Sequence, residues 1–294
     1  MERIIRLGAL NIVTQPHSPD RYQALLQHVR KRQKAGRIRS DRFGVIGTLG
    51  VPDSAKRADA YAQGTLTTFT QIDVEGDWVN VITGEKAEDG ERQLIHIPDN
   101  LRPNPAYHHF RFYLREHLLI FEIGNSSHRL TPNNAGKLFE RLFSAPTVVK
   151  EFGDVAVTVM PTRDAISSIL REKDIRSLQL RVHAPNPPDD GREAERRFLK
   201  RIEGLGARTL EQRVVAKSDR PIKPDAELVE AARIAARNGE VSATVKHGGR
   251  TMKVSTTDSP FVYVHEWHTG NNTEENEFGK ACDIVRHQLR DDHQ

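Results

Sequence analysis

The apolar residues of this chain come in short stretches that follow two different spacings along the whole sequence. Ser177 to Val182 places an apolar residue at every second position, which is typical of a strand. Thr131 to Phe143 repeats its apolar residues every three or four positions, as a helix with one buried face does. No long region lacks Val, Ile, Leu or Phe. The pattern therefore predicts an α+β protein with mainly antiparallel sheets and helices packed on one face.

The order of these stretches also suggests how the chain divides into domains. It reads β-α-β-β at the start and β-α-β again near the middle, so two ferredoxin-like units are one arrangement that it allows. The clearest break is residues 186–191, which hold two prolines, two aspartates and a glycine. We therefore expect an N-terminal lobe over residues 1–185, divisible into units 1–125 and 126–185, and a C-terminal lobe over residues 192–294.

Charge and cysteine content narrow the class of protein further. No apolar run approaches the roughly 20 residues that a membrane-spanning helix requires, and the first residues carry charges at Glu2, Arg3 and Arg6 instead of the apolar core of a signal peptide. The single cysteine, Cys282, excludes an intramolecular disulfide framework and a multi-cysteine zinc site, and its helical setting predicts a buried side chain. These features predict a soluble cytoplasmic protein.

The strongest functional hint is a helix-like segment, residues 22–42, which is apolar at its start and basic afterwards. The helix that contains the start of this segment is expected to begin at Pro19 and to end near Gly36. Cations near a helix C-terminus are stabilised by only about 0.3–1 kcal/mol each, so seven of them, opposed only by Asp41, exceed that purpose. The net charge of +4 and pI of about 9.2 agree with an anionic partner. We predict a soluble polyanion-binding protein that binds RNA or DNA through Arg30, Lys31, Arg32, Lys34, Arg37, Arg39 and Arg42; a solvated helix end is the alternative.

One expected strand also alternates aromatic and basic residues, a pattern that single-stranded nucleic acid recognises by base stacking. The strand covers residues 107–113, and the set that would face outward is Tyr107, His109, Arg111 and Tyr113. A packed strand with a polar outer face is the competing interpretation. The segment therefore adds a candidate RNA-binding surface to the basic stretch without deciding between the two.

The histidines of the chain suggest two enzymatic interpretations, of which only the first stays open. His265 and His268, with Asp258 nearby in sequence, are candidate metal ligands for a metal-assisted phosphodiester hydrolase, although a zincin helix requires histidines four positions apart. Arg111 and His117 have a spacing close to that of helical ribonucleases, but such a pair needs one helix face, and the alternation of the apolar residues 110, 112 and 114 predicts a strand there. A divalent metal is expected only under the first interpretation, and no other cofactor is predicted. A third hypothesis is a structural subunit that binds a protein partner or forms an oligomer.

Several stretches together resemble an uncharacterised bacterial protein family of about this chain's length. They are LGALNIV at 7–13, Tyr22 with Leu25 and Leu26, GTLTTFTQIDVEGDWVN at 64–80 and HHFRFYLREHLLIFE at 108–122. The resemblance covers nearly the whole chain but carries no catalytic position, because these are architectural residues. It implies a bacterial cytoplasmic protein from a mobile-element or phage-defence setting.

Overall fold

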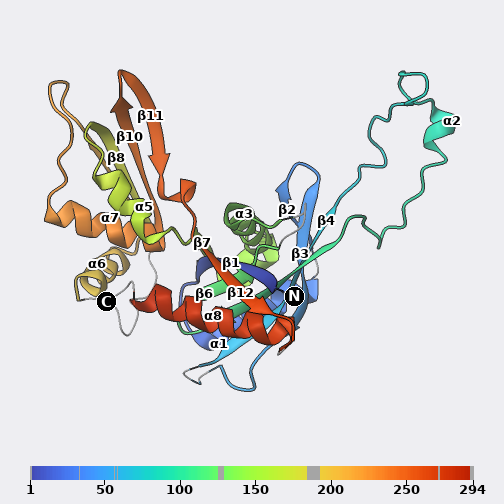
Figure 1. Ribbon diagram of the computed structural model, residues 1–294, viewed down its shortest axis with the longest axis horizontal. Helices are drawn as coiled ribbons and strands as arrows, with labels where there is room; N and C mark the ends of the chain where they lie inside the picture. The colour runs from blue at the N-terminus through green and yellow to red at the C-terminus, as the bar shows by residue number, and fades with distance from the viewer. Residues whose placement is uncertain are drawn as a thin grey trace.

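Two antiparallel sheets with flanking helices form the protein, as a computed structural model shows for residues 2–32, 34–55, 57, 59–124, 129–183, 193–270 and 272–291 (Figure 1). The α+β class and the antiparallel pairing predicted from the sequence are confirmed. The strands are β1 (Glu2–Val13), β2 (Gly36–Arg39), β3 (Arg42–Gly50), β4 (Tyr61–Thr70), β5 (Ala106–Tyr113), β6 (Leu118–Glu122), β7 (Ala156–Val159), β8 (Ile175–His183), β9 (Thr209–Val215), β10 (Gly239–His247), β11 (Arg250–Ser255) and β12 (Val262–His268). The helices are α1 (Pro19–Arg32), α2 (Asp89–Arg92), α3 (Pro132–Phe143), α4 (Pro146–Phe152), α5 (Arg163–Leu170), α6 (Glu193–Gly204), α7 (Ala226–Asn238) and α8 (Glu274–Asp291).

The larger sheet has the strand order β12-β1-β6-β5-β4-β3-β2, and β7 pairs with the last residues of β1. Helices α1, α3 and α4 contribute to the core on one face, and α8 packs on the other. The prediction of helices on one face is therefore wrong for this sheet. The sequence of β6 shows the reason: Leu119 and Phe121 enter the first core whereas Leu118 and Ile120 enter the second, so both faces need a cover.

The smaller sheet has the order β11-β10-β8-β9 and carries α5, α6 and α7 on one face. Leu178, Leu180 and Val182 of β8 point into this core, as their alternation predicts. The elements follow one another as β-α-β-α-β-β from β8 to β11, which differs from the β-α-β-β-α-β order of a ferredoxin-like unit.

The two sheets do not divide the chain at the predicted break. The residues 184–192, which include that break, lie outside the described part and connect β8 to α6, two elements of the smaller unit. At the other end, β12 pairs with β1 from Glu2 to Gly8, and α8 packs on the larger sheet. The lobes expected over 1–185 and 192–294 therefore share strands across their boundary, because long-range strand pairing is not visible as a local composition change.

The basic segment after α1 is a strand, not the end of the helix. Helix α1 ends at Arg32, and β2 begins at Gly36 and turns back through Ser40 into β3. Ile38 is buried between exposed Arg37 and Arg39, which is the two-residue period of a strand. Gly36 lets α3 approach closely, since a Cβ atom there would lie 3.1 Å from the backbone oxygen of Leu138. Packing against α3 thus overrides the helical tendency of the preceding residues.

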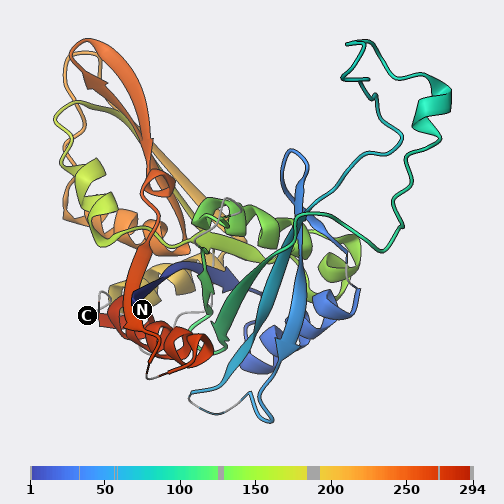
Figure 2. The same cartoon turned by 45° about the vertical axis from the view of Figure 1, so that its right-hand side comes forward.

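A long connection between β4 and β5, residues 71–105, projects from the body of the protein and carries α2 near its far end (Figure 1, Figure 2). Residues 71–105 are called the arm below. Among the described residues, no helix combines the length and the apolar character needed to cross a lipid bilayer.

Candidate polyanion-binding site

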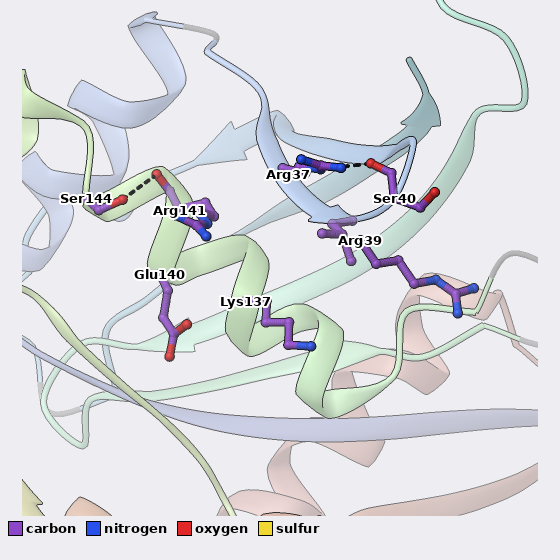
Figure 3. A pocket seen from close by; sticks show the side chains of 8 residues that line it. Arg37, Arg39, Ser40, Lys137, Glu140, Arg141 and Ser144 are labelled. Carbon is purple, nitrogen blue, oxygen red and sulfur yellow. Dashed lines mark hydrogen bonds between the residues drawn. The ribbon is translucent and has the colours of Figure 1, made fainter. Parts of the chain in front are cut away.

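A pocket of about 640 Å³ lies between the β2–β3 hairpin and helix α3 (Figure 3). One wall comes from the edge strand of the larger sheet and its turn, and the other comes from the solvent side of the helix. The lining residues are Arg37, Ile38, Arg39, Ser40, Lys137, Glu140, Arg141 and Ser144. Four of these eight side chains are cationic, so the pocket is the place in the fold where the basic segment meets a second basic element.

Helix α3 supplies its two cations because its apolar stripe fixes which side faces the sheet. Thr131 caps the helix by accepting a hydrogen bond from the Asn134 backbone N–H (3.4 Å), and Pro132 occupies the first turn. Leu138 and Phe139 are fully buried in the larger core. The exposed face therefore holds the residues between the stripe positions, among them Lys137 and Arg141, which are four apart and lie on one side of the helix.

The hairpin supplies its two cations through the alternation of β2. Arg37 and Arg39 are exposed, and the turn residue Ser40 has a positive φ of 42°. The Arg37 Nε–H donates to the Ser40 carbonyl oxygen at 2.8 Å, so the turn holds the start of this guanidinium group. The remaining N–H donors of Arg37 make no hydrogen bond with any described residue.

The electrostatic balance of the pocket is positive. Arg39, Lys137 and Arg141 form no side-chain hydrogen bond or ion pair within the described part of the chain. Glu140 is the one acidic lining residue, and its side chain points away from the hairpin (Figure 3). Partial burial raises the pKa of Glu140, against the opposing effect of Arg141 and Lys137. The arrangement offers several unpaired N–H donors to an anion, and guanidinium groups match phosphate oxygens well.

The seven basic residues predicted to act together fall into three groups. Arg37 and Arg39 line the pocket, whereas Lys31, Arg32 and Lys34 are exposed at or just after the end of α1, with Arg30 half-buried beside them. Arg42, the third group, forms hydrogen bonds within the fold.

Arg42 holds the base of the arm. Its Nη2 donates to Thr68 Oγ1 at 2.7 Å and its Nη1 donates to the Asn104 carbonyl oxygen at 2.8 Å. Burial lowers the pKa of Arg42, although the group stays charged. The sequence did not point to Lys137 and Arg141 as partners of the hairpin; the only signal was their position on the polar side of the expected helix 131–143.

The strand predicted to stack bases is mostly covered by α8. Tyr113 is 1% exposed and Arg111 is 9% exposed. The guanidinium carbon of Arg111 lies 4.1 Å from the centroid of the Tyr61 ring, and Nη1 donates to the Gly279 carbonyl oxygen at 3.4 Å. Tyr113 Oη donates to Asp283 Oδ1 at 2.7 Å. These two residues therefore hold α8 against the sheet, which leaves no room for a base.

The other two residues of that strand face different surroundings. His109 is half-buried, its Nδ1 lies 3.2 Å from Glu122 Oε2, and this contact raises its pKa. Tyr107 is exposed near the start of β5. The structure thus does not gather the four predicted side chains into one stacking surface.

The two candidate metal ligands lie on opposite faces of β12. His265 faces α8 and its Nε2 donates to Glu277 Oε2 at 2.9 Å, whereas His268 is exposed on the other side. Asp258 accepts a hydrogen bond from the Ser255 backbone N–H at 2.8 Å. Within the described ranges, no group of three or more His, Cys, Asp or Glu side chains is placed to hold a metal ion. The spacing of three positions explains the result, because strand side chains alternate in direction.

The nuclease-like pair is also separated. Arg111 contacts α8, whereas His117 sits in the β5–β6 turn with a positive φ of 57° and lies beside α1 residues on the other face. The Nε2 atoms of His117 and His17 are 3.0 Å apart, and burial lowers the pKa of His117 to about 3. The neutral, buried imidazole of His117 packs against Tyr22 and therefore has a structural role.

These observations define an α+β protein with two antiparallel sheets and an open cationic pocket beside an edge strand. The chain belongs to the family described as Domain of unknown function (DUF4747), which it matches over residues 3–283. No curated protein matches the sequence. The predicted membership of an uncharacterised family is confirmed, and the bacterial source and phage-defence setting stay hypotheses.

Proposed function

We propose that this protein binds a polyanion with a phosphodiester backbone, RNA or DNA, at the pocket between the β2–β3 hairpin and α3. The observation that carries the proposal is the convergence of four cations from two separate elements on one pocket, three of them with neither a side-chain hydrogen bond nor an ion pair among the described residues. Basic side chains that only face solvent would not have to converge on one pocket, so the convergence favours binding.

The chemistry of the lining favours contacts to the phosphate backbone. None of the eight lining residues is aromatic, so base stacking is absent from the pocket itself, whereas arginine and lysine displace condensed counterions from phosphates. Backbone contacts position a nucleic acid without reading its bases. We therefore expect binding with little sequence preference and a strong dependence on salt.

The test is fluorescence anisotropy with short labelled single-stranded RNA and DNA over a range of salt concentrations. The variant Arg39→Gln/Lys137→Gln/Arg141→Gln removes the three unpaired cations. If each contacts one phosphate, the slope of log affinity against log salt becomes shallower by about 2, at roughly 0.7 per contact on a single strand. The affinity at moderate salt is expected to fall by at least about tenfold.

A matched control removes the same charge elsewhere. Lys200, Lys217 and Lys223 are exposed residues of the smaller unit, and Lys200→Gln/Lys217→Gln/Lys223→Gln leaves the pocket intact. This variant is expected to keep the wild-type salt slope. Equal losses in both triple variants would show that net charge, not the pocket, determines binding, and an unchanged pocket variant would contradict the proposal.

A further inference from the structure

The arm is an ordered segment without a core. It connects β4 to β5, two neighbouring antiparallel strands that a few residues could join, yet it spans residues 71–105. Its tip is held by backbone hydrogen bonds, from Ala87 N–H to the Trp78 oxygen at 2.8 Å and from Asn80 N–H to the Glu85 oxygen at 2.9 Å. None of residues 71–105 is buried. A defined backbone with no buried side chain indicates a segment shaped for contact with another molecule.

The apolar side chains of the arm are displayed to solvent. Val81 is 87% exposed and Ile82 is 92% exposed, and Val79 and Leu94 are exposed as well. Exposed apolar side chains gathered on one projecting segment are typical of a protein interaction surface. Burying them against a partner removes their apolar area from water, which is favourable.

The charge of the arm identifies the kind of partner. Eight acidic residues stand against three basic ones, so the arm carries −5 and the rest of the chain +9, which together give the net charge of +4. The acidic residues are Asp73, Glu75, Asp77, Glu85, Glu88, Asp89, Glu91 and Asp99, and the basic ones are Lys86, Arg92 and Arg102. Such a segment repels nucleic acid and anionic lipid and complements a basic protein surface, and the body of this same chain is basic.

The β10–β11 hairpin has the complementary composition. Lys246, Arg250 and Lys253 are exposed on it and form no side-chain ion pair with a described residue, and Met252 between them is exposed. Strand β11 is also the edge of the smaller sheet, so its outer backbone groups are open to pairing. The cations of the hairpin complement the acids of the arm, and its apolar side chain and open edge complement the exposed valine and isoleucine.

The arm and this hairpin project toward the same side of the molecule from opposite ends, in both views (Figure 1, Figure 2). A two-fold axis between the ends would bring the arm of each copy to the hairpin of the other. We propose that two copies of this chain form such a dimer, in which the arm of one docks on the β10–β11 hairpin of its partner. The two contacts are identical by symmetry, as in an isologous interface.

A charge-reversal experiment on the full chain tests the dimer by sedimentation velocity. One variant, Glu75→Lys/Glu85→Lys, reverses two exposed acids of the arm whose carboxylates have no partner among the described residues; the other, Arg250→Glu/Lys253→Glu, reverses the hairpin. Each variant alone should sediment as a monomer at concentrations where the wild type is a dimer. Their equimolar mixture should dimerise again, because both contacts are then between opposite charges.

A third variant separates the apolar part of the contact. Val81→Ser/Ile82→Ser keeps every charge and should shift the wild-type protein toward monomer, and circular dichroism of all variants checks that they are folded. A wild-type chain that is monomeric over its whole soluble range, dimers that ignore the reversals, or a mixture that stays monomeric would overturn the proposal. Because the hairpin lies outside the α3 pocket, these outcomes are independent of oligonucleotide binding.

Discussion

The outer face of β5 and the β2–β3 hairpin both present arginine from a strand of the same sheet, but they differ in what covers them. Arg111 of the central strand β5 lies beneath α8, whereas Arg39 of the edge strand β2 faces an open pocket beside α3. Both arginines lie in stretches where apolar and basic residues alternate: Arg111 stands between Phe110 and Phe112, and Arg39 follows Ile38. The comparison teaches that the element packed on a strand, not the strand's own pattern, decides whether its arginine stabilises the fold or stays open to solvent.

The covered arginine is stabilised by local partners. A buried guanidinium stays charged, so it needs compensation, and Arg111 finds it in the ring of Tyr61 and in Asp283, whose Oδ1 lies 3.4 Å from Nη1. Arg39 keeps its solvation and makes no ion pair with a described residue. Its charge is therefore available to an incoming anion at a lower desolvation cost.

The largest effect is expected from removing the covered arginine. Arg111→Ala deletes the contact with Tyr61, the hydrogen bond to Gly279 and much of the packing under α8, and we expect a loss of about 2–4 kcal/mol in unfolding free energy. The measurement is urea-induced unfolding followed by circular dichroism. Tyr113→Phe, which removes the hydroxyl that donates to Asp283 and keeps the ring, serves as a milder control at about 1 kcal/mol.

The same variant also tests the comparison itself. Under conditions where Arg111→Ala remains folded, its affinity for the labelled oligonucleotides should equal that of the wild type, because the pocket is untouched. A stable Arg111→Ala protein that has lost oligonucleotide binding would place the ligand on the β5 face and refute the distinction between the two arginines.

A smaller effect is expected from acid, which acts on the covered face through Glu277 of α8. Hydrogen bonds from His265, Lys280 and Asn272 lower the pKa of Glu277 from an ordinary 4.5 to about 2. A carboxyl whose pKa is lower in the folded state stabilises the fold above its unfolded pKa, and that contribution is lost as the pH falls from about 4.5 toward 2.

The check is the thermal midpoint of the wild type and of Glu277→Gln across that pH range. The wild type should be the more stable protein near neutral pH, and the difference between the two should shrink as the pH falls below about 4.5. A difference that stays constant with pH would show that the Glu277 carboxylate does not anchor α8 through its charge.

The comparison also shows which parts could be predicted from the sequence. Phe278, Cys282, Val285 and Leu289 recur at the spacing of an amphipathic helix and are buried against the sheet, and the predicted burial of Cys282 in a helix is confirmed. The spacing could not reveal that α8 would cover Arg111, a residue 172 positions from its partner Asp283. Local periodicity reports which face of an element is apolar, and long-range pairing decides what lies against it.

The pocket could not be predicted from the sequence for the same reason. The exposed cations of β2 and those of α3 were each visible as polar positions in their own pattern, but their convergence depends on Gly36 and on the path of α3 along the edge strand. The period of Arg37, Ile38 and Arg39 was the available signal for a strand. Three residues are too few to outweigh the helical spacing that precedes them, so the sequence predicts one helix end for the whole basic segment.

The smallest effect is expected at the end of α1, where the cations are as exposed as those of the pocket but come from a single helix end. Lys31→Gln/Arg32→Gln removes two exposed charges, and Arg39→Gln/Arg141→Gln removes two from the pocket. The helix-end variant should weaken oligonucleotide binding by only about two- to threefold, as a long-range electrostatic effect that salt screens.

The pocket variant should lose about tenfold or more, with a salt slope shallower by about 1.4, and both variants are measured by anisotropy on the same oligonucleotides. Thermal unfolding controls for the helix, because cations in the last turn contribute about 0.3–1 kcal/mol each through the macrodipole. Equal losses of affinity would mean that the bound strand runs along both surfaces. A larger loss at the helix end would move the site to α1 and leave the convergence of the hairpin and α3 without a role in binding.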